Sequence, residues 1–220
     1  SAVSPASTAE STRSLAAATA EAQTAPVVRG DVTALVGWTG FDPRTPRRPG
    51  DQTRWDGTLY GGLSAGWYWT DHFKTEIEVG AAQEGQGFGF ELVNVDGRLL
   101  NRYRRSAIER RTLGISQQYQ YGRNAWFHPH VAFGVSIAFD SRTDYYDPLI
   151  NYAAPGYREV EPARTEGPLR STSMRPFLGG GFKAYVSPRT FVRVDARLGG
   201  GTAKRGLDEA LARIGFGIDF

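Results

Sequence analysis

Cysteine is absent from the 220 residues, and histidine occurs only three times. Without cysteine the chain can form no disulfide framework, no zinc–thiolate site and no cysteine nucleophile. It also contains no run of 18 apolar residues, which a membrane-spanning helix needs. This absence excludes spanning by helices but not by β-strands, whose alternating pattern gives a weaker signal.

Charge of either sign is in only small excess, with 26 basic and 23 acidic residues and a net charge of +3. The charges are interleaved rather than gathered in a basic stripe, so we expect no nucleic-acid partner. No signal peptide is visible, and the chain begins at Ser1. We therefore expect a mature form from which an export signal has been removed.

The composition divides the chain at about residue 26. Residues 1–26 are mostly Ala, Ser, Thr and Glu, which bury little apolar surface and predict a flexible tail. Its Ala-rich stretch has one large apolar residue, Leu15. We favour a spacer, with a tether for a periplasmic partner as the alternative. Residues 27–220 form the second unit, a single β-domain.

From residue 27 onward the chain shows the period of two that is typical of strands. In Phe73–Val79, the residues Phe, Thr, Ile and Val alternate with Lys74, Glu76 and Glu78. The segment Val192–Leu198 alternates in the same way with Arg193, Asp195 and Arg197. Eight such segments are predicted, at 28–40, 54–69, 73–86, 109–121, 126–139, 173–186, 191–200 and 209–220.

These segments predict an all-β fold, a closed eight-stranded antiparallel up-and-down barrel. Short connections near residues 70–72, 121–124 and 187–190 alternate with long ones at 41–53, 87–108 and 140–172 and a modest one at 201–208. In outer-membrane barrels the short turns are periplasmic and the long loops extracellular. Both termini are then expected in the periplasm.

The polar face of the strands favours a transmembrane barrel over a soluble, lipocalin-like one. It mixes charges with very small residues such as Gly62, Ser64 and Gly66. A solvent-facing surface does not need such small residues, but the lumen of an eight-stranded barrel is only just wide enough for its side chains. We therefore expect the apolar face outside, against lipid.

Aromatic residues are predicted to form a belt at each membrane interface. Trp38 and Trp55 fall at the strand ends nearest the long loops. A second group falls near the short turns, comprising Trp67, Trp69, Phe73, Tyr119, Tyr121, Trp126, Phe127, Tyr185 and Phe191.

The last segment, Arg213-Ile-Gly-Phe-Gly-Ile-Asp-Phe220, resembles the C-terminal signal of outer-membrane barrels. Arg213, Gly215, Ile218 and Phe220 match its polar, glycine, apolar and aromatic positions. The layout of residues 27–220 resembles that of the small OmpA/OmpX-type barrels. The resemblance implies that Phe220 belongs to a signal read by the barrel assembly machinery, and that outer-membrane lipid and lipopolysaccharide surround the protein.

Charged residues on the predicted lumen face are the main candidate functional feature. Buried charges must be paired, so a nearly balanced set predicts a salt-bridged, closed lumen. A small gated channel, in which the pairs exchange partners, is the alternative. The set comprises Arg54, Asp56, Lys74, Glu76, Glu78, Lys183, Arg193, Asp195, Arg197, Arg213 and Asp219.

No catalytic, cofactor or metal residues are predicted. Some small barrels modify lipid A, and the deacylase type uses a His–Ser pair near the outer end. Here His72, His128 and His130 fall at the opposite end. His128-Pro-His130 resembles half a metal site but lacks an identified third ligand. Tyr and Arg residues in the 140–172 loop suggest instead that the protein binds an external ligand or protein.

Overall fold

The computed structural model describes residues 29–41, 54–121, 126–151, 156, 158–200 and 207–220, with only the backbone at residues 41, 54, 55, 207 and 208. The predicted tail 1–26 and most of the predicted loop 41–53 lie outside these residues. The strands are β1 Gly30–Phe41, β2 Arg54–Trp55, β3 Thr58–Tyr68, β4 Phe73–Val95, β5 Arg98–Gln120, β6 Phe127–Tyr146, β7 Leu149–Asn151, β8 Arg158–Glu161, β9 Arg164–Tyr185, β10 Thr190–Gly200 and β11 Leu207–Asp219.

Eight of these strands form a closed antiparallel ring. Their order is β4-β3-β1-β11-β10-β9-β6-β5, and the pairing of β4 with β5 completes the circle. The first and last strands of the ring meet along their length, from Asp31 opposite Asp219 to Phe41 opposite Glu209. β2 pairs only with β4. It comes just before β3 in the chain and pairs with the same neighbour, so it is not counted as a separate strand of the ring. The predicted eight-stranded barrel is confirmed.

The faces of the strands also follow the prediction. On β10, Arg193, Asp195 and Arg197 are buried in the lumen, while Val194 and Leu198 face outward and are exposed. On β4, Lys74, Glu76 and Glu78 are buried and Ile77 and Val79 are exposed.

Four strands are longer than predicted. β4 and β5 continue through the predicted loop 87–108 and turn only at Asp96-Gly97. The predicted loop 140–172 is mostly strand as well, in β6, β9 and the small β7–β8 pair. Gly87 and Gly89 lie in this extended part of β4 and pair with Ser106 and Arg104 of β5.

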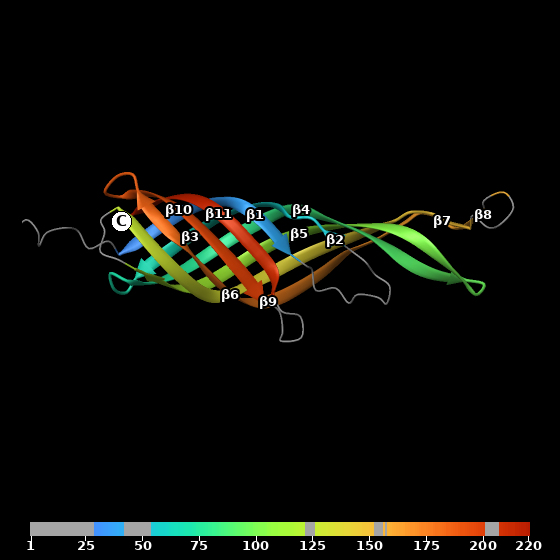
Figure 1. Cartoon of the computed structure of the whole chain (residues 1–220), viewed down its shortest axis with the longest axis horizontal. Coiled ribbons are helices and arrows are strands. Elements are labelled where there is room, and N and C mark those ends of the chain that lie inside the picture. The colour runs from blue at the N-terminus through green and yellow to red at the C-terminus, as the bar shows by residue number, and fades with distance from the viewer. Residues whose placement is uncertain (1–28, 42–53, 122–125, 152–155, 157, 201–206) are drawn as a thin grey trace, which may run out of the picture.

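The extra length forms what we call the blade, residues 83–95 of β4, 98–108 of β5, 140–146 of β6 and 164–170 of β9. It projects beyond one end of the barrel, away from the C-terminus (Figure 1). The opposite end, which we call the turn end, carries the short connections 69–72 and 186–189. A register shift between Ala82 and Gly85 separates the blade part of β4 from its barrel part.

No helix in the described part of the chain is long and apolar enough to cross a membrane.

Candidate functional site

The lumen at the turn end holds two buried lysines on one carboxylate. Lys74 Nζ on β4 lies 2.9 Å from Oδ2 of Asp31 on β1, and Lys183 on β9 contacts the same oxygen. The hydroxyl of Tyr68 donates to Asp31 at 3.0 Å. Lys183 also lies 3.6 Å from Asp219. Asp31 therefore joins strands from different parts of the ring at this level.

Glu76 accepts bonds from three cations in the middle of the lumen. Its Oε2 lies 2.5 Å from Nη1 of Arg193 and 2.9 Å from Nζ of Lys74. Its Oε1 lies 3.3 Å from Nη2 of Arg197. This carboxylate is 1% exposed, so the cations replace the water that would otherwise solvate it.

Arg213 on β11 connects the adjacent strand β10 with β4, which lies farther around the ring. Its Nε lies 2.5 Å from Asp195 on the adjacent β10, and its Nη1 lies 2.5 Å from Glu78 on β4. Glu78 is also 2.7 Å from Arg197. We call the ion pairs described so far the inner ion layer. Its basic members Lys74, Lys183, Arg193, Arg197 and Arg213 balance its acidic members Asp31, Glu76, Glu78, Asp195 and Asp219.

A second set of charges, the outer ion layer, lies nearer the blade. Arg110 on β5 binds both oxygens of Asp140 on β6, at 2.6 and 2.8 Å. Glu209 on β11 lies 3.2 Å from Arg110 and 3.1 Å from Arg175 on β9. The bidentate geometry is the one in which arginine binds carboxylates most specifically.

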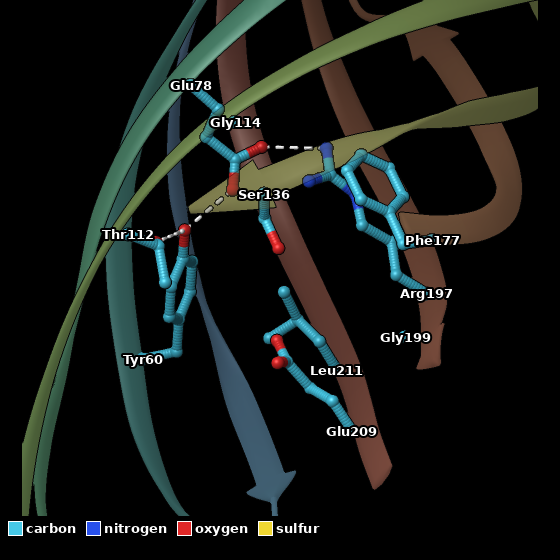
Figure 2. Close-up of a pocket in the computed structure, with 10 residues that line it drawn as sticks. All are labelled: Tyr60, Glu78, Thr112, Gly114, Ser136, Phe177, Arg197, Gly199, Glu209 and Leu211. Atoms are coloured by element: carbon cyan, nitrogen blue, oxygen red, sulfur yellow. Dashed lines mark hydrogen bonds and ion pairs between the residues drawn. The ribbon is translucent and has the colours of Figure 1, made fainter. Parts of the chain in front are cut away.

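A small cavity lies between the two ion layers. Glu78 and Arg197 line it from the inner layer and Glu209 from the outer one. Its volume is about 20 Å³, enough for about one water molecule. Figure 2 shows Tyr60 and Phe177 on opposite sides of this space, with Leu211 between them.

Most of the predicted lumen charges are found in the inner ion layer, with two exceptions. The side chain of Arg54 lies outside the described residues. The prediction for Asp56 was wrong, because Asp56 lies between β2 and β3 with an exposed side chain. It follows the end of β2, so it does not share the alternation that turns β3 residues inward.

Asp31 and the whole outer ion layer were not predicted from the sequence. Asp31 alternates with Thr33 and Leu35, which are also buried, so its place on the polar face of β1 could have been found. Arg110, Asp140 and Arg175 lie near the boundaries between predicted strands and loops. Their inward orientation follows from the continuation of β5, β6 and β9 into the blade.

The histidines form no metal site in the described residues, where no cluster of three or more potential ligands occurs. His130 is buried in the lumen and His128 is half-buried, so the two do face inward. His128 packs edge-on against Tyr185 with ring centroids 5.3 Å apart. His72 lies in the turn between β3 and β4 and stacks on Tyr119.

Eight of the predicted interfacial aromatics are exposed. Trp38 lies near the blade end of β1, and the other seven lie near the turn end: Trp67, Trp69, Phe73, Tyr119, Tyr121, Trp126 and Phe127. The prediction for Tyr185 was wrong, because its hydroxyl donates a hydrogen bond to Asp219 in the lumen. The side chain of Trp55 is not described. Phe191 was wrongly assigned to the belt. It is fully buried in the lumen, where Lys183 Nζ lies 3.9 Å from its ring centroid, because it shares the inward face of Arg193.

The C-terminal motif residues divide between the two faces of β11. Ile218 and Phe220 are exposed on the outer side, while Arg213 is buried in the inner ion layer. Gly215 also faces inward. A Cβ at this position would lie 2.7 Å from side-chain carbons of Leu35 and Thr33, so the glycine leaves room for the neighbouring strand's side chains.

The outer wall of the barrel is apolar over a height that suits a membrane. Val194, Leu198, Ile214, Phe216 and Ile218 on β10 and β11 are all exposed. Strands β1, β3, β10 and β11 have 12, 11, 11 and 13 residues, and a tilted strand needs about 9–11 residues to span a bilayer. Charges in the lumen and hydrocarbon outside are the reverse of a soluble barrel.

The protein has the architecture of the small outer-membrane β-barrels. Among solved structures it is similar to OprG of Pseudomonas aeruginosa, with 15% identity, a TM-score of 0.49, and 88% of this chain and 97% of that chain covered. Neisserial surface protein A has 10% identity and a TM-score of 0.47, with 87% of this chain and 97% of that chain covered. The N-terminal barrel of Pseudomonas aeruginosa OprF has 14% identity and a TM-score of 0.44, with 86% of this chain and 97% of that chain covered.

No protein-family model and no curated protein matches the sequence. The assignment to a transmembrane barrel therefore rests on the strand register and on the distribution of side chains described above.

The outer face of the blade carries a second apolar surface. Phe90, Leu92, Leu99 and Tyr103 are exposed on β4 and β5, and Leu99 has an exposed fraction of 67%. The rings of Phe90 and Tyr103 meet edge to face with centroids 5.7 Å apart. We call these four residues the blade patch.

A polar zone separates the blade patch from the apolar wall of the barrel. Glu109 and Arg111 on β5 are exposed on the outer face, opposite Ser141 and Phe139 of β6. Below them, Leu113 and Ile115 continue the apolar wall. Charged side chains facing lipid are costly at the bilayer midplane but tolerated at its edge. The blade patch therefore lies beyond the hydrocarbon region.

The other face of the blade is polar and holds the β7–β8 pair. Arg102 on β5 forms an ion pair with Glu161 at the end of β8. Tyr146 contacts two guanidinium groups, with Arg164 at 4.7 Å and Arg102 at 5.9 Å from its ring centroid. The hydrogen bond from Arg102 lowers the pKa of the Glu161 carboxyl. Leu149 on β7 is fully buried, and β7 contacts β5, the strand that carries Arg102.

Proposed function

We propose that the protein is an outer-membrane barrel with a closed lumen, which binds an external protein through the blade. The blade patch carries this proposal. Large exposed apolar patches on otherwise polar surfaces are typical of interaction sites, and aromatic residues are common binding anchors. Because the patch lies beyond the polar zone at Glu109 and Arg111, lipid does not account for its apolar character.

The proposal places the blade outside the cell and the turn end in the periplasm. The short connections at the turn end support this orientation, because periplasmic turns are short in outer-membrane barrels. The chain contains no cysteine, so single cysteines can report the orientation directly. On intact cells a membrane-impermeant maleimide should label Leu99→Cys and leave Arg189→Cys unlabelled. The reverse pattern would contradict the orientation.

Contact with a partner can be tested by photo-cross-linking in living cells. A photoreactive side chain at Leu99 should give a discrete protein adduct under conditions in which the bacterium meets its partner. The same group at Arg170, which is exposed on β9 outside the patch, serves as the control. Tyr103→Ser should weaken the adduct. Equal cross-linking at both positions, or at neither, would count against the blade patch as the binding surface.

The closed lumen is supported by the balanced ion layers and by the small volume of the cavity between them. The alternative is a small gated channel. Recording from planar bilayers distinguishes the two, since the wild-type barrel should show no steady conductance. Lipid A modification, the third option, would appear as a changed lipid A mass in cells that express the protein.

A further inference from the structure

The two ion layers of the lumen are separated by apolar side chains. On β11 three successive inward residues are Glu209, Leu211 and Arg213, so an apolar residue lies between a member of each layer. On β9, Phe177 follows the outer-layer Arg175 on the same face. Alternation of charge, hydrocarbon and charge along one strand places Leu211 and Phe177 at the same level as the small cavity, which both of them line.

Tyr60 on β3 lies at the same level, because it lines the cavity as well and belongs to one buried apolar cluster with Leu211. Thr112 and Ser136 line the cavity from β5 and β6. We call Tyr60, Phe177 and Leu211, which come from three strands of the ring, the apolar layer.

The apolar layer is fixed to the inner ion layer rather than stacked loosely on it. The Tyr60 hydroxyl donates to Glu78 at 2.6 Å, and the guanidinium of Arg197 lies 4.5 Å from the ring centroid of Phe177. Gly80 makes room for the tyrosine, since a Cβ there would lie 1.9 Å from its hydroxyl oxygen. Figure 2 shows Tyr60 reaching Glu78 from one side and Phe177 beside Arg197 on the other.

We infer that the apolar layer, and not the salt bridges, is the barrier to water and ions in this lumen. The inference rests on the closed lumen proposed above. Hydrophobic constrictions block ions by excluding water, and this does not depend on charge. The cavity at this level has a volume of about 20 Å³, which suits about one water molecule and is too small for a hydrated ion.

The inference separates two kinds of lumen variant. Glu78→Gln/Arg197→Gln removes the Glu78–Arg197 ion pair, together with the contacts of Glu78 with Arg213 and of Arg197 with Glu76. If the apolar layer is the barrier, this double variant stays as silent as the wild type in planar bilayers. Phe177→Ala/Leu211→Ser removes two members of the apolar layer and leaves every lumen charge in place. It should show steady conductance at least ten times above the wild-type background.

The controls keep the outcomes distinct. Leu198→Ser, on the outer wall of β10, makes the same kind of exchange without touching the lumen and should remain silent. Each variant is checked for the heat-dependent gel shift of a folded barrel. If Phe177→Ala/Leu211→Ser does not fold, Tyr60→Ala opens the same layer from β3.

Conductance in Glu78→Gln/Arg197→Gln, or silence in folded apolar-layer variants, would overturn the inference and leave the closed lumen standing. Conductance of the wild type would instead contradict the closed lumen itself.

Discussion

The carboxylate of Glu78 on β4 lies 2.5 Å from the guanidinium of Arg213 on β11, although 135 residues separate them in the chain. Their strands are not neighbours in the ring, since β3 and β1 lie between them. The pair therefore crosses the lumen, and it forms only when the sheet curls far enough to bring β4 and β11 together. The stability of the barrel and its closure are linked through this contact.

Loss of one member of this pair should destabilise the barrel strongly. Arg213→Ala leaves Glu78 and Asp195 buried with fewer cations, and breaking a buried pair in this way costs about 3–5 kcal/mol. Urea unfolding in detergent or lipid, followed by tryptophan fluorescence, measures the free energy of unfolding. Asp56→Asn is the matched control, because Asp56 is exposed and should change this energy little. A similar effect of both substitutions would show that the pair is not a stabilising contact.

The tip of the blade depends on a turn with left-handed backbone. Asp96 and Gly97 have φ angles of 51° and 80°, which suit the tight Asp-Gly turn of a hairpin. Gly97→Val places a β-branched residue there at a cost of about 1–2 kcal/mol. Hydrogen exchange should accelerate at amides near the tip, in residues 90–103, while amides of β10 and β11 keep their protection. Uniform acceleration would mean that the blade and the barrel unfold together.

The attachment of β8 to the blade should weaken only in acid. The pKa of Glu161 is lowered by its hydrogen bond to Arg102. The ion pair is therefore fully present above the ordinary glutamate pKa and is lost as the pH falls through the lowered value. Spin labels on β8 and β5 should report a constant distance from neutral pH down to that range and a broader one below it. Glu161→Gln should show the broad distribution at every pH, and a pH-dependent change in that variant would argue against Glu161 as the responsible group.

Phe220 should matter more for assembly than other lipid-facing phenylalanines. Its resemblance to the final aromatic of the C-terminal signal predicts that Phe220→Ser reduces the folded, heat-modifiable form in cells while export continues. Phe133→Ser provides the comparison, because Phe133 is also exposed on the outer wall. Equal amounts of folded protein in both variants would remove the special role of Phe220.

The sequence predicted the strands best where one face is strictly polar and the other apolar. Segments 73–79 and 192–198 were assigned correctly in both position and orientation, because a period of two admits only one inward face. The blade was missed because glycines interrupt the apolar alternation in its β4 part and because polar and charged residues dominate its β5 and β6 parts. The Asp96-Gly97 pair was the available signal, since this dipeptide favours a two-residue hairpin turn.

The sequence by itself determined that this chain crosses the membrane as a closed sheet. One face of its alternating strands carries small and charged residues, and those charges can be paired only around a narrow lumen. It also determined which residues of β4 and β10 face that lumen. Only the tertiary structure decided which charges meet, since ring closure brings β4 opposite β11 and the stagger between strands sets their relative heights. The same stagger places Tyr60, Phe177 and Leu211 at one level between two ion layers, which no local pattern in the sequence encodes.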